Sequence, residues 1–227
     1  MQQLRYLYQD EQIFVVYKPA GIHSVRLPSS SGGASIADLL LRDSPTLSKV
    51  GAEEVDAGLV MRLDLSTSGI LLGAKTEEMW CTLHDMIASG DVDKHYIAQL
   101  EGELTDPATI ESYIGSPHRG AKKMKVYEKK PAKSARALQG TTQFVPISYD
   151  HNIDITTVKA IASPARRHQI RVHASHIGHP LVGDVLYGST RPLAVVDSED
   201  RTFFLHAAYL SFTHPLTSER VTVECPY

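Results

Sequence analysis

The sequence predicts an α+β fold, with a mixed, largely antiparallel central sheet and flanking helices, in a single domain over residues 1–227. Strand patterns outnumber helix patterns and do not alternate regularly with them, which argues against a doubly wound parallel sheet. The 227-residue chain is about one and a half typical domains long, and no internal repeat or long linker marks a boundary within it. Its 42% hydrophobic and 22% charged residues are typical of a globular protein.

The first elements are predicted from a short β-rich segment and a helix-start pattern. Ile13–Tyr17 is followed by the turn-forming Lys18–Gly21, which predicts a strand that ends in a turn. Ser35 with Asp38 three residues later is a capping-box variant, and three leucines follow it. A short helix is therefore expected here, ending before Pro45.

The middle and the C-terminal part predict one more long helix and several strands. Ile70–Ala74 is an apolar run typical of a buried strand, and Thr76 then caps a helix that ends at Gly90. Along Val92–Leu100 apolar residues alternate on one strand face, which only a lysine interrupts. The other predicted strands are Thr109–Tyr113, Met124–Tyr127, Arg136–Val145, Ile155–Ile161, Tyr209–Thr213 and Val221–Glu224.

The charge of the chain is unevenly distributed. The net charge is −3, which by itself argues against a nucleic-acid binder. However, residues 118–136 carry eight Lys and Arg side chains against one acid, a net charge of +7. Such a run is either a solvated face or a binding surface for a polyanion, and the sequence alone leaves both interpretations open.

Two segments carry residues suited to chemistry. The first runs from Arg62 to Gly69 and places one carboxylate, Asp64, in a Ser/Thr-rich turn ahead of a buried strand. An aspartate in such a turn often only binds its own backbone. The second segment predicts a short helix that begins at the Ser163-Pro164 turn and ends at Gly178, which would place Arg167 and Arg171 one turn apart.

Together, these motifs resemble the RluA-type family of RNA pseudouridine synthases. Any one of them would be a weak match, but six occur in the family's order and spacing, from about residue 7 to the C-terminus. They are Lys18-Pro19-Ala20-Gly21; Arg62-Leu63-Asp64 with Thr67-Ser68-Gly69; Lys94-His95-Tyr96; His168-Gln169-Ile170-Arg171-Val172-His173; Gly178-His179-Pro180 with Gly183-Asp184 and Leu186-Tyr187-Gly188; and Leu205-His206-Ala207 with His214-Pro215-Leu216.

The resemblance implies an isomerase that converts a specific uridine in structured RNA to pseudouridine, without a cofactor or a metal. It implies that Asp64 is the catalytic carboxylate, that Tyr96 stacks on the target base, and that Arg171 pairs with Asp64. Arg62 would fill the gap left when the base is flipped out of its stack, a step that costs a few kcal/mol. An arginine near Asp64 would favour its ionised form, which a nucleophilic carboxylate needs.

The partner is implied by the resemblance, and its basic contacts are predicted from the charge distribution as well. The expected partner is tRNA or rRNA, bound by a monomeric catalytic domain with no appended N-terminal RNA-binding domain. No apolar run is long enough for a membrane helix and no secretory signal is evident, so we expect a cytoplasmic protein. The predicted RNA-binding residues are Arg62, Lys122, Lys123, Lys125, Arg166, Arg167 and His168.

Three other interpretations fit some of these residues. Histidines 168, 173, 176 and 179, with Asp184 nearby, suggest a metal site, but their spacing fits no zinc motif. A glycoside hydrolase also breaks a bond at a sugar C1′, but it needs two carboxylates, and only Asp64 lies in a motif. The remaining alternative is a non-catalytic RNA-binding protein or RNA chaperone on the same scaffold, although a carboxylate beside a polyanion would weaken binding.

Overall fold

The computed structural model describes residues 3–26, 34–131, 137–191, 193 and 202–227. Its residue contacts divide into two compact units. Unit 1 contains the described residues up to Asp93 and those from Ala207 onward, and unit 2 contains the described residues between Lys94 and His206. The prediction of a single catalytic domain therefore remains a prediction. No described helix is long and apolar enough to cross a membrane.

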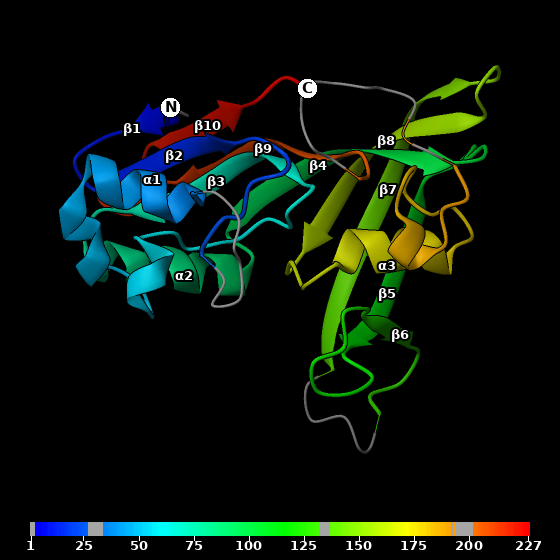
Figure 1. The fold of residues 1–227 in the computed structure, drawn as a ribbon, viewed down its shortest axis with the longest axis horizontal. Helices are drawn as coiled ribbons and strands as arrows, with labels where there is room; N and C mark the ends of the chain where they lie inside the picture. Colours follow the sequence, from blue (N-terminus) through cyan, green and yellow to red (C-terminus); the bar gives the residue numbers. More distant parts are fainter. Residues whose placement is uncertain (1–2, 27–33, 132–136, 192, 194–201) are drawn as a thin grey trace. The chain divides into compact units, whose positions relative to one another are not determined.

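Unit 1 is built on a sheet with the strand order β1-β2-β3-β9, with β10 paired to β9 (Figure 1). The ladders β1–β2, β2–β3 and β9–β10 are antiparallel. β3 is buried along its whole length, which explains its almost continuous apolar sequence. The strands are β1 (Arg5–Gln9), β2 (Ile13–Lys18), β3 (Ser68–Ala74), β9 (Leu205–Thr213) and β10 (Arg220–Glu224).

The helices of unit 1 begin at the caps that the sequence predicts. Ser35 accepts a hydrogen bond from the Asp38 amide and the Asp38 carboxylate accepts one from the Ser35 amide, so α1 (Ile36–Asp43) starts with a complete capping box. Thr76 caps α2 (Glu77–Ser89), which Gly90 ends at a φ of 91°. Two short 3₁₀ segments, η1 (Pro45–Lys49) and η2 (Glu54–Asp56), lie between α1 and β3. The apolar side of α1 packs with β2 in the core of this unit.

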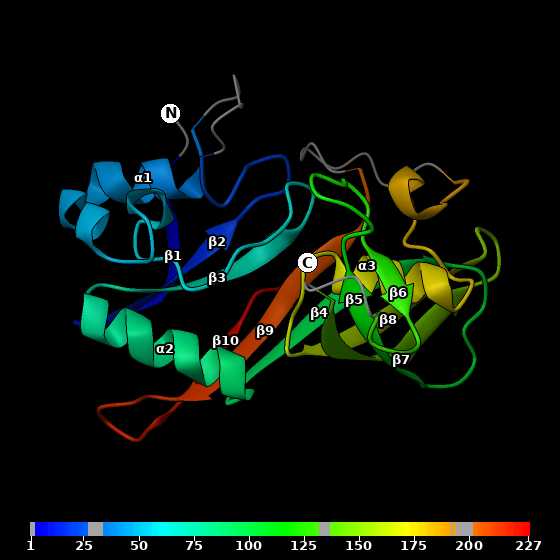
Figure 2. The same ribbon diagram turned by 90° about the horizontal axis from the view of Figure 1, so that it is seen from below.

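Unit 2 has the strand order β4-β8-β7-β5-β6, and the four ladders that join these strands are antiparallel. The helix α3 (Gln169–His176) packs against β6, β7 and β8 (Figure 2). A 3₁₀ turn, η3 (Val185–Tyr187), also contacts α3. The strands are β4 (Val92–Glu101), β5 (Ala108–Gly115), β6 (Lys125–Tyr127), β7 (Leu138–Asp150) and β8 (Ile155–Ser163).

These elements confirm the predicted fold class, a largely antiparallel sheet structure with flanking helices. Each predicted strand has a counterpart, although β9 starts four residues earlier than predicted and the predicted first residue of β7, Arg136, lies outside the described residues. The strand β1 was missed. It forms a hairpin with β2 because Asp10 Oδ1 accepts hydrogen bonds from the amides of Gln12 and Ile13, at 2.7 and 2.8 Å, and so closes the turn.

The predicted start of the third helix is wrong. α3 begins at Gln169, after His168, whose φ of 55° is left-handed and cannot continue a helix. Gln169 stabilises this start, because its Oε1 accepts a hydrogen bond from the Arg166 amide at 2.9 Å. Arg167 therefore precedes the helix and is not one helical turn before Arg171.

Candidate functional site

In unit 1, the residue before Asp64 is held by one hydroxyl group. Ser24 Oγ accepts a hydrogen bond from the Leu63 amide at 3.0 Å and donates one to the Leu63 carbonyl at 3.1 Å. The Asp64 carbonyl in turn accepts from the Thr67 amide at 3.1 Å, which closes the turn. Both backbone groups of the residue before Asp64 are thus fixed, and Asp64 itself is half-buried.

The Lys18–Gly21 turn holds the same segment from its other side. Lys18 is fully buried, and its Nζ donates hydrogen bonds to the carbonyls of Pro19 and Leu65, at 2.9 and 3.1 Å. The Gly21 amide donates to the Leu65 carbonyl as well, at 2.9 Å. Two motifs that lie far apart in the sequence therefore form one structure, in which the first supports the backbone that carries Asp64.

Gly69, the glycine that closes the Asp64 motif, lies where no other residue fits. Its φ is 112°, and a Cβ there would lie 2.3 Å from the backbone oxygen of Ala207 on β9. Any side chain would therefore push β3 away from β9 within unit 1.

Arg62 is bound within unit 1 by a buried acid. Its Nη2 lies 2.6 Å from Asp56 Oδ1, and Asp56 is 4% exposed. Asp56 Oδ2 also accepts a hydrogen bond from the Glu53 amide at 3.1 Å. Since the Arg62 side chain is itself about half-exposed, the ion pair holds the guanidinium at the surface.

Unit 2 contains the other two predicted catalytic residues. Tyr96 lies on β4 opposite Ala160 of β8 and is 6% exposed. Arg171 lies on α3, and its Nε and Nη2 donate to the two carboxylate oxygens of Asp184, at 2.7 and 2.9 Å. Sequence analysis placed Asp184 in a motif and near the histidines of the metal alternative, but did not predict that it pairs with Arg171. The predicted pairing of Arg171 with Asp64, which belongs to unit 1, remains a prediction.

Aromatic rings surround the buried Arg171–Asp184 pair. The Arg171 guanidinium lies 4.3 Å from the ring centroid of Phe203 and 5.0 Å from that of Tyr187. Since both charges are buried, this apolar setting strengthens their attraction, and the two parallel hydrogen bonds fix the guanidinium plane.

The predicted RNA-binding lysines lie on a loop that is bound to the start of α3. Arg167 donates from Nη1 and Nη2 to the carbonyls of Ala121 and Lys122, at 3.4 and 3.3 Å. The Tyr187 hydroxyl accepts a hydrogen bond from the Met124 amide at 2.8 Å. Lys122, Lys123 and Lys125 are exposed on this loop and on β6, so their charges face solvent. Of the +7 segment, residues 132–136 lie outside the described residues.

His168 and Arg166 also help to shape this surface. His168 Nδ1 lies 2.9 Å from the Tyr187 hydroxyl, and the two rings meet edge to face. Arg166 Nε donates to the Gln139 carbonyl on β7 at 3.2 Å. The structure thus brings five of the seven predicted RNA-binding residues, Lys122, Lys123, Arg166, Arg167 and His168, around the start of α3.

His173 joins α3 to β5 and β7. It is fully buried between two hydroxyl groups, with Nε2 2.8 Å from Ser112 Oγ and Nδ1 2.8 Å from Thr142 Oγ1. Burial lowers its pKa from 6.5 to about 4, and the neighbouring His176 contributes to this shift. Among the described residues, no group of three or more His, Cys, Asp or Glu could hold a metal ion. The four histidines of the metal alternative therefore do not come together in such a group.

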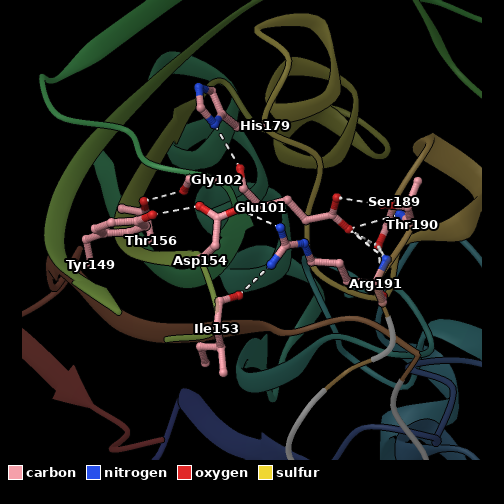
Figure 3. A network of polar contacts seen from close by, with 10 residues as sticks. All are labelled: Glu101, Gly102, Tyr149, Ile153, Asp154, Thr156, His179, Ser189, Thr190 and Arg191. Carbon is pink, nitrogen blue, oxygen red and sulfur yellow. Dashed lines mark hydrogen bonds and ion pairs between the residues drawn. The ribbon is translucent and has the colours of Figure 1, made fainter. Parts of the chain in front are cut away.

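A polar network at another part of unit 2 fixes residues 189–191 (Figure 3). Glu101 Oε1 accepts hydrogen bonds from Ser189 Oγ and from the amides of Thr190 and Arg191, at 2.5, 3.0 and 3.1 Å. The Arg191 guanidinium binds Asp154 Oδ2 at 2.5 Å. This network lies on unit 2 strands and loops and includes none of the predicted site residues, and sequence analysis did not find it.

Comparison with known proteins decides the family. A family model described as RNA pseudouridylate synthase matches residues 12–176, which is more than half of the chain. The chain belongs to this family. The matched range contains Asp64, Tyr96 and Arg171, the three residues to which the resemblance assigns the chemistry.

Relatives with curated names extend the similarity to nearly the whole chain. The chain is 32% identical over 98% of its length to "Ribosomal large subunit pseudouridine synthase D" of Nitrosomonas europaea and covers 62% of that protein. It is 34% identical over 99% of its length to the protein of the same name from Pseudomonas aeruginosa, of which it covers 68%. The chain therefore spans about two thirds of the length of these pseudouridine synthases.

Solved structures show the same fold. "Human RNA Pseudouridylate Synthase Domain Containing 1" matches with a TM-score of 0.73 and 26% identity, over 99% of this chain and 84% of that one. "Human RNA Pseudouridylate Synthase Domain Containing 4" matches with a TM-score of 0.71 at 21% identity, which is a similarity of fold alone.

Proposed function

We propose that this protein converts a specific uridine of a structured tRNA or rRNA to pseudouridine. The observation that carries the proposal is the family match over residues 12–176, which includes all three proposed catalytic residues. The rigid backbone around Asp64 adds support, because catalysis requires a carboxylate held in a defined position.

The proposed reaction breaks the bond between the uracil and C1′ of the ribose, rotates the base, and joins C5 to C1′. The proton on C5 is lost to solvent and N1 gains one, so the reaction is an isomerisation that consumes no other reactant. Asp64 acts as the catalytic carboxylate, by attack at C1′, by attack at C6 or by removal of the 2′ proton. Tyr96 stacks on the base and takes the C5 proton.

Two arginines serve this chemistry in different ways. Arg171 keeps Asp64 ionised by its charge, with its own plane fixed by Asp184. Arg62 enters the base stack when the target nucleotide is flipped out, and to do so it leaves Asp56. Because Asp56 is buried, its carboxylate loses its paired cation when Arg62 leaves, and the contacts of Arg62 with the RNA have to offset that cost.

RNA is the proposed partner, and the basic surface on unit 2 is its proposed binding site. The surface comprises Lys122, Lys123, Lys125, Arg166, Arg167 and His168. Large-subunit ribosomal RNA is the first substrate to test, because two of the relatives are named for it. We further propose that the enzyme works without a metal, as a monomer, in the cytoplasm.

The deciding experiment measures tritium release from RNA labelled at C5 of uracil, with large-subunit rRNA and total tRNA as the two substrates. Wild type is expected to release tritium and to form pseudouridine at a defined position. Asp64→Asn keeps the side-chain volume and removes the charge, so it is expected to bind RNA without turnover. Tritium release by Asp64→Asn would refute the assignment of Asp64. RNA binding by wild type without any release would favour the non-catalytic alternative.

A further inference from the structure

A buried lysine beside Tyr96 has no partner in the part of the chain that the structure describes. Lys94, the third residue of β4, is 8% exposed. Its ammonium group makes no hydrogen bond and no ion pair with any described residue. Lysines are rarely buried without a paired anion, so this position is unusual.

Lys94 lies on the same face of the unit 2 sheet as Tyr96 and α3. Side chains two apart on a strand point to the same face, so Lys94 and Tyr96 share one, about 6 to 7 Å apart along the strand. Tyr96 pairs with Ala160, and the same register places Ala162 opposite Lys94. Ala162 pairs with Thr142, whose hydroxyl binds α3 through Gln169 and His173.

The charged and titratable groups on the elements around Lys94 leave its charge uncompensated. On α3, Arg171 is a cation bound by Asp184, and His173 is neutral near pH 7 because burial lowers its pKa to about 4. On β8 the facing residues are alanines. The part of β9 that belongs to unit 2, Leu205 and His206, contributes one titratable residue, His206. The one carboxylate in this set, Asp184, is thus already engaged.

Burial alone lowers the pKa of Lys94 to about 8, without a contribution from any neighbouring charge. The ammonium group is nevertheless not sealed in. Among the described residues, only Thr67 Oγ1 is a fully enclosed side-chain polar atom without a hydrogen bond, so the unpartnered Lys94 Nζ retains contact with solvent. The methylene groups of the side chain are buried while the ammonium group keeps some contact with solvent, so an anion from solution can reach it.

We propose that Lys94 binds a backbone phosphate of the RNA next to the nucleotide whose base stacks on Tyr96. The proposal rests on the proposed function above and names a further contact of that site. A phosphate is the anionic group that RNA offers, and Lys is a point-charge ligand for it. A nucleotide held on Tyr96 brings its own flanking phosphates to this face of β4, and a phosphate there would stabilise a buried charge that the free protein leaves uncompensated.

The test combines Lys94→Met with RNA in which one linkage that flanks the target uridine is a neutral methylphosphonate. The RNA is a stem-loop in which wild type has been shown to form pseudouridine. At pH 7, Lys94→Met is expected to bind the unmodified RNA about 10-fold or more weakly, which corresponds to at least about 1.4 kcal/mol. At the linkage that Lys94 contacts, methylphosphonate should weaken RNA binding by wild type by a similar factor. It should weaken binding by Lys94→Met only a little, because the two changes remove the same interaction.

A pH series gives an independent readout through Lys94→Arg. The free amine of Lys94 titrates near pH 8, and a bound phosphate raises that pKa, so wild-type affinity should fall as the pH rises from about 8 to about 10. Lys94→Arg keeps its charge over this range and should bind with little pH dependence. Lys159→Met is the matched control, since Lys159 lies on β8 opposite Ile97 and so on the other face of the sheet. This variant should bind RNA with the affinity and pH dependence of wild type.

These outcomes separate the proposal from the function on which it rests. If wild type forms no pseudouridine, the proposed function fails. If wild type is active but the effects of Lys94→Met and of methylphosphonate are additive at both flanking linkages, the phosphate contact is wrong. If Lys94→Arg binds normally yet loses turnover, Lys94 exchanges protons in the reaction, and the proposal is likewise overturned. Should Lys94→Met not fold, the pH series with Lys94→Arg decides alone.

Discussion

Arg171 and Asp184 form a two-point contact, in which the Nε and Nη2 of one bind both carboxylate oxygens of the other. Both side chains are less than 10% exposed. A buried pair of this kind stabilises a fold only while both partners are present, because either charge alone would be buried without compensation. Arg171 therefore has a structural function beside the catalytic one that we propose for it, and a variant that loses activity has to be checked for loss of structure.

We expect Arg171→Ala to lower the free energy of unfolding by about 3 to 5 kcal/mol, since it leaves the Asp184 carboxylate buried and unpaired. Urea denaturation measures the change. Arg119→Ala, which removes an exposed charge on the basic loop, is the control and should change stability by no more than about 0.5 kcal/mol. A decrease below about 1 kcal/mol for Arg171→Ala would show that the pair contributes little to folding.

His173 is expected to make stability depend on pH. The unfolded chain protonates this imidazole below about pH 6.5, whereas the folded protein resists protonation down to about pH 4. The contribution of His173 is thus complete above pH 6.5 and is lost as the pH falls towards 4, by an amount on the order of 3 kcal/mol. Urea denaturation of wild type and of His173→Gln at pH 7.5 and 5 measures it.

Between pH 7.5 and 5, the free energy of unfolding of His173→Gln should change less than that of wild type. His118→Gln, at an exposed position, should retain the wild-type profile. Equal slopes for wild type and His173→Gln would contradict the prediction.

The lysines of the basic loop are expected to set the salt dependence of RNA binding. Removing one phosphate contact reduces the slope of log K against log salt by about 0.7 to 0.9, so replacing Lys122, Lys123 and Lys125 with Gln should reduce it by about 2 to 3. Fluorescence anisotropy over a salt series measures the slope. Lys49→Gln, in η1 of unit 1, is the control, because it lies outside the basic surface. If the triple variant retains the wild-type slope, the lysines form a solvated face.

Two threonines should respond in opposite ways to the same substitution. Thr67 Oγ1 is buried and has no hydrogen-bond partner among the described residues, so Thr67→Val should keep the free energy of unfolding or raise it by about 1 kcal/mol. Thr142 Oγ1 binds both Gln169 and His173, so Thr142→Val should lower it by about 1 to 3 kcal/mol. A clear decrease for Thr67→Val would mean that its hydroxyl group has a partner, such as a bound water molecule.

Local sequence signals were sufficient for the elements that begin and end with strong caps. The Ser35 capping box and the Gly90 end of α2 depend on neighbours within four residues, which a sequence shows directly. The start of α3 was placed too early because the left-handed His168 is stabilised by Tyr187, nineteen residues away. No local pattern carries that information.

The candidate site could be predicted as a set of residues but not as a set of contacts. Asp64, Tyr96 and Arg171 came from motifs, whereas Asp56 and Ser24, which hold Arg62 and the Asp64 segment, lie in no motif that sequence analysis singled out. Lys94 was noted as an exception on an apolar strand face and as the first residue of the Lys94-His95-Tyr96 motif, but no function was predicted for it. Its burial, on which the proposed phosphate contact depends, follows from packing between strands that are distant in the chain.

Ser24 holds both backbone groups of Leu63, so the residue before Asp64 depends on a single side chain for contacts that a neighbouring strand would otherwise supply. The backbone at Leu63 can therefore open without breaking the β2–β3 ladder, and the Leu63 amide reports that local opening. In native-state hydrogen exchange, Ser24→Ala is expected to speed exchange at Leu63 and to leave Leu72 of β3 unchanged. Equal acceleration at both amides would mean that the segment and the sheet open together, and the exchange rate of one amide would then no longer measure how often the proposed catalytic carboxylate leaves its position.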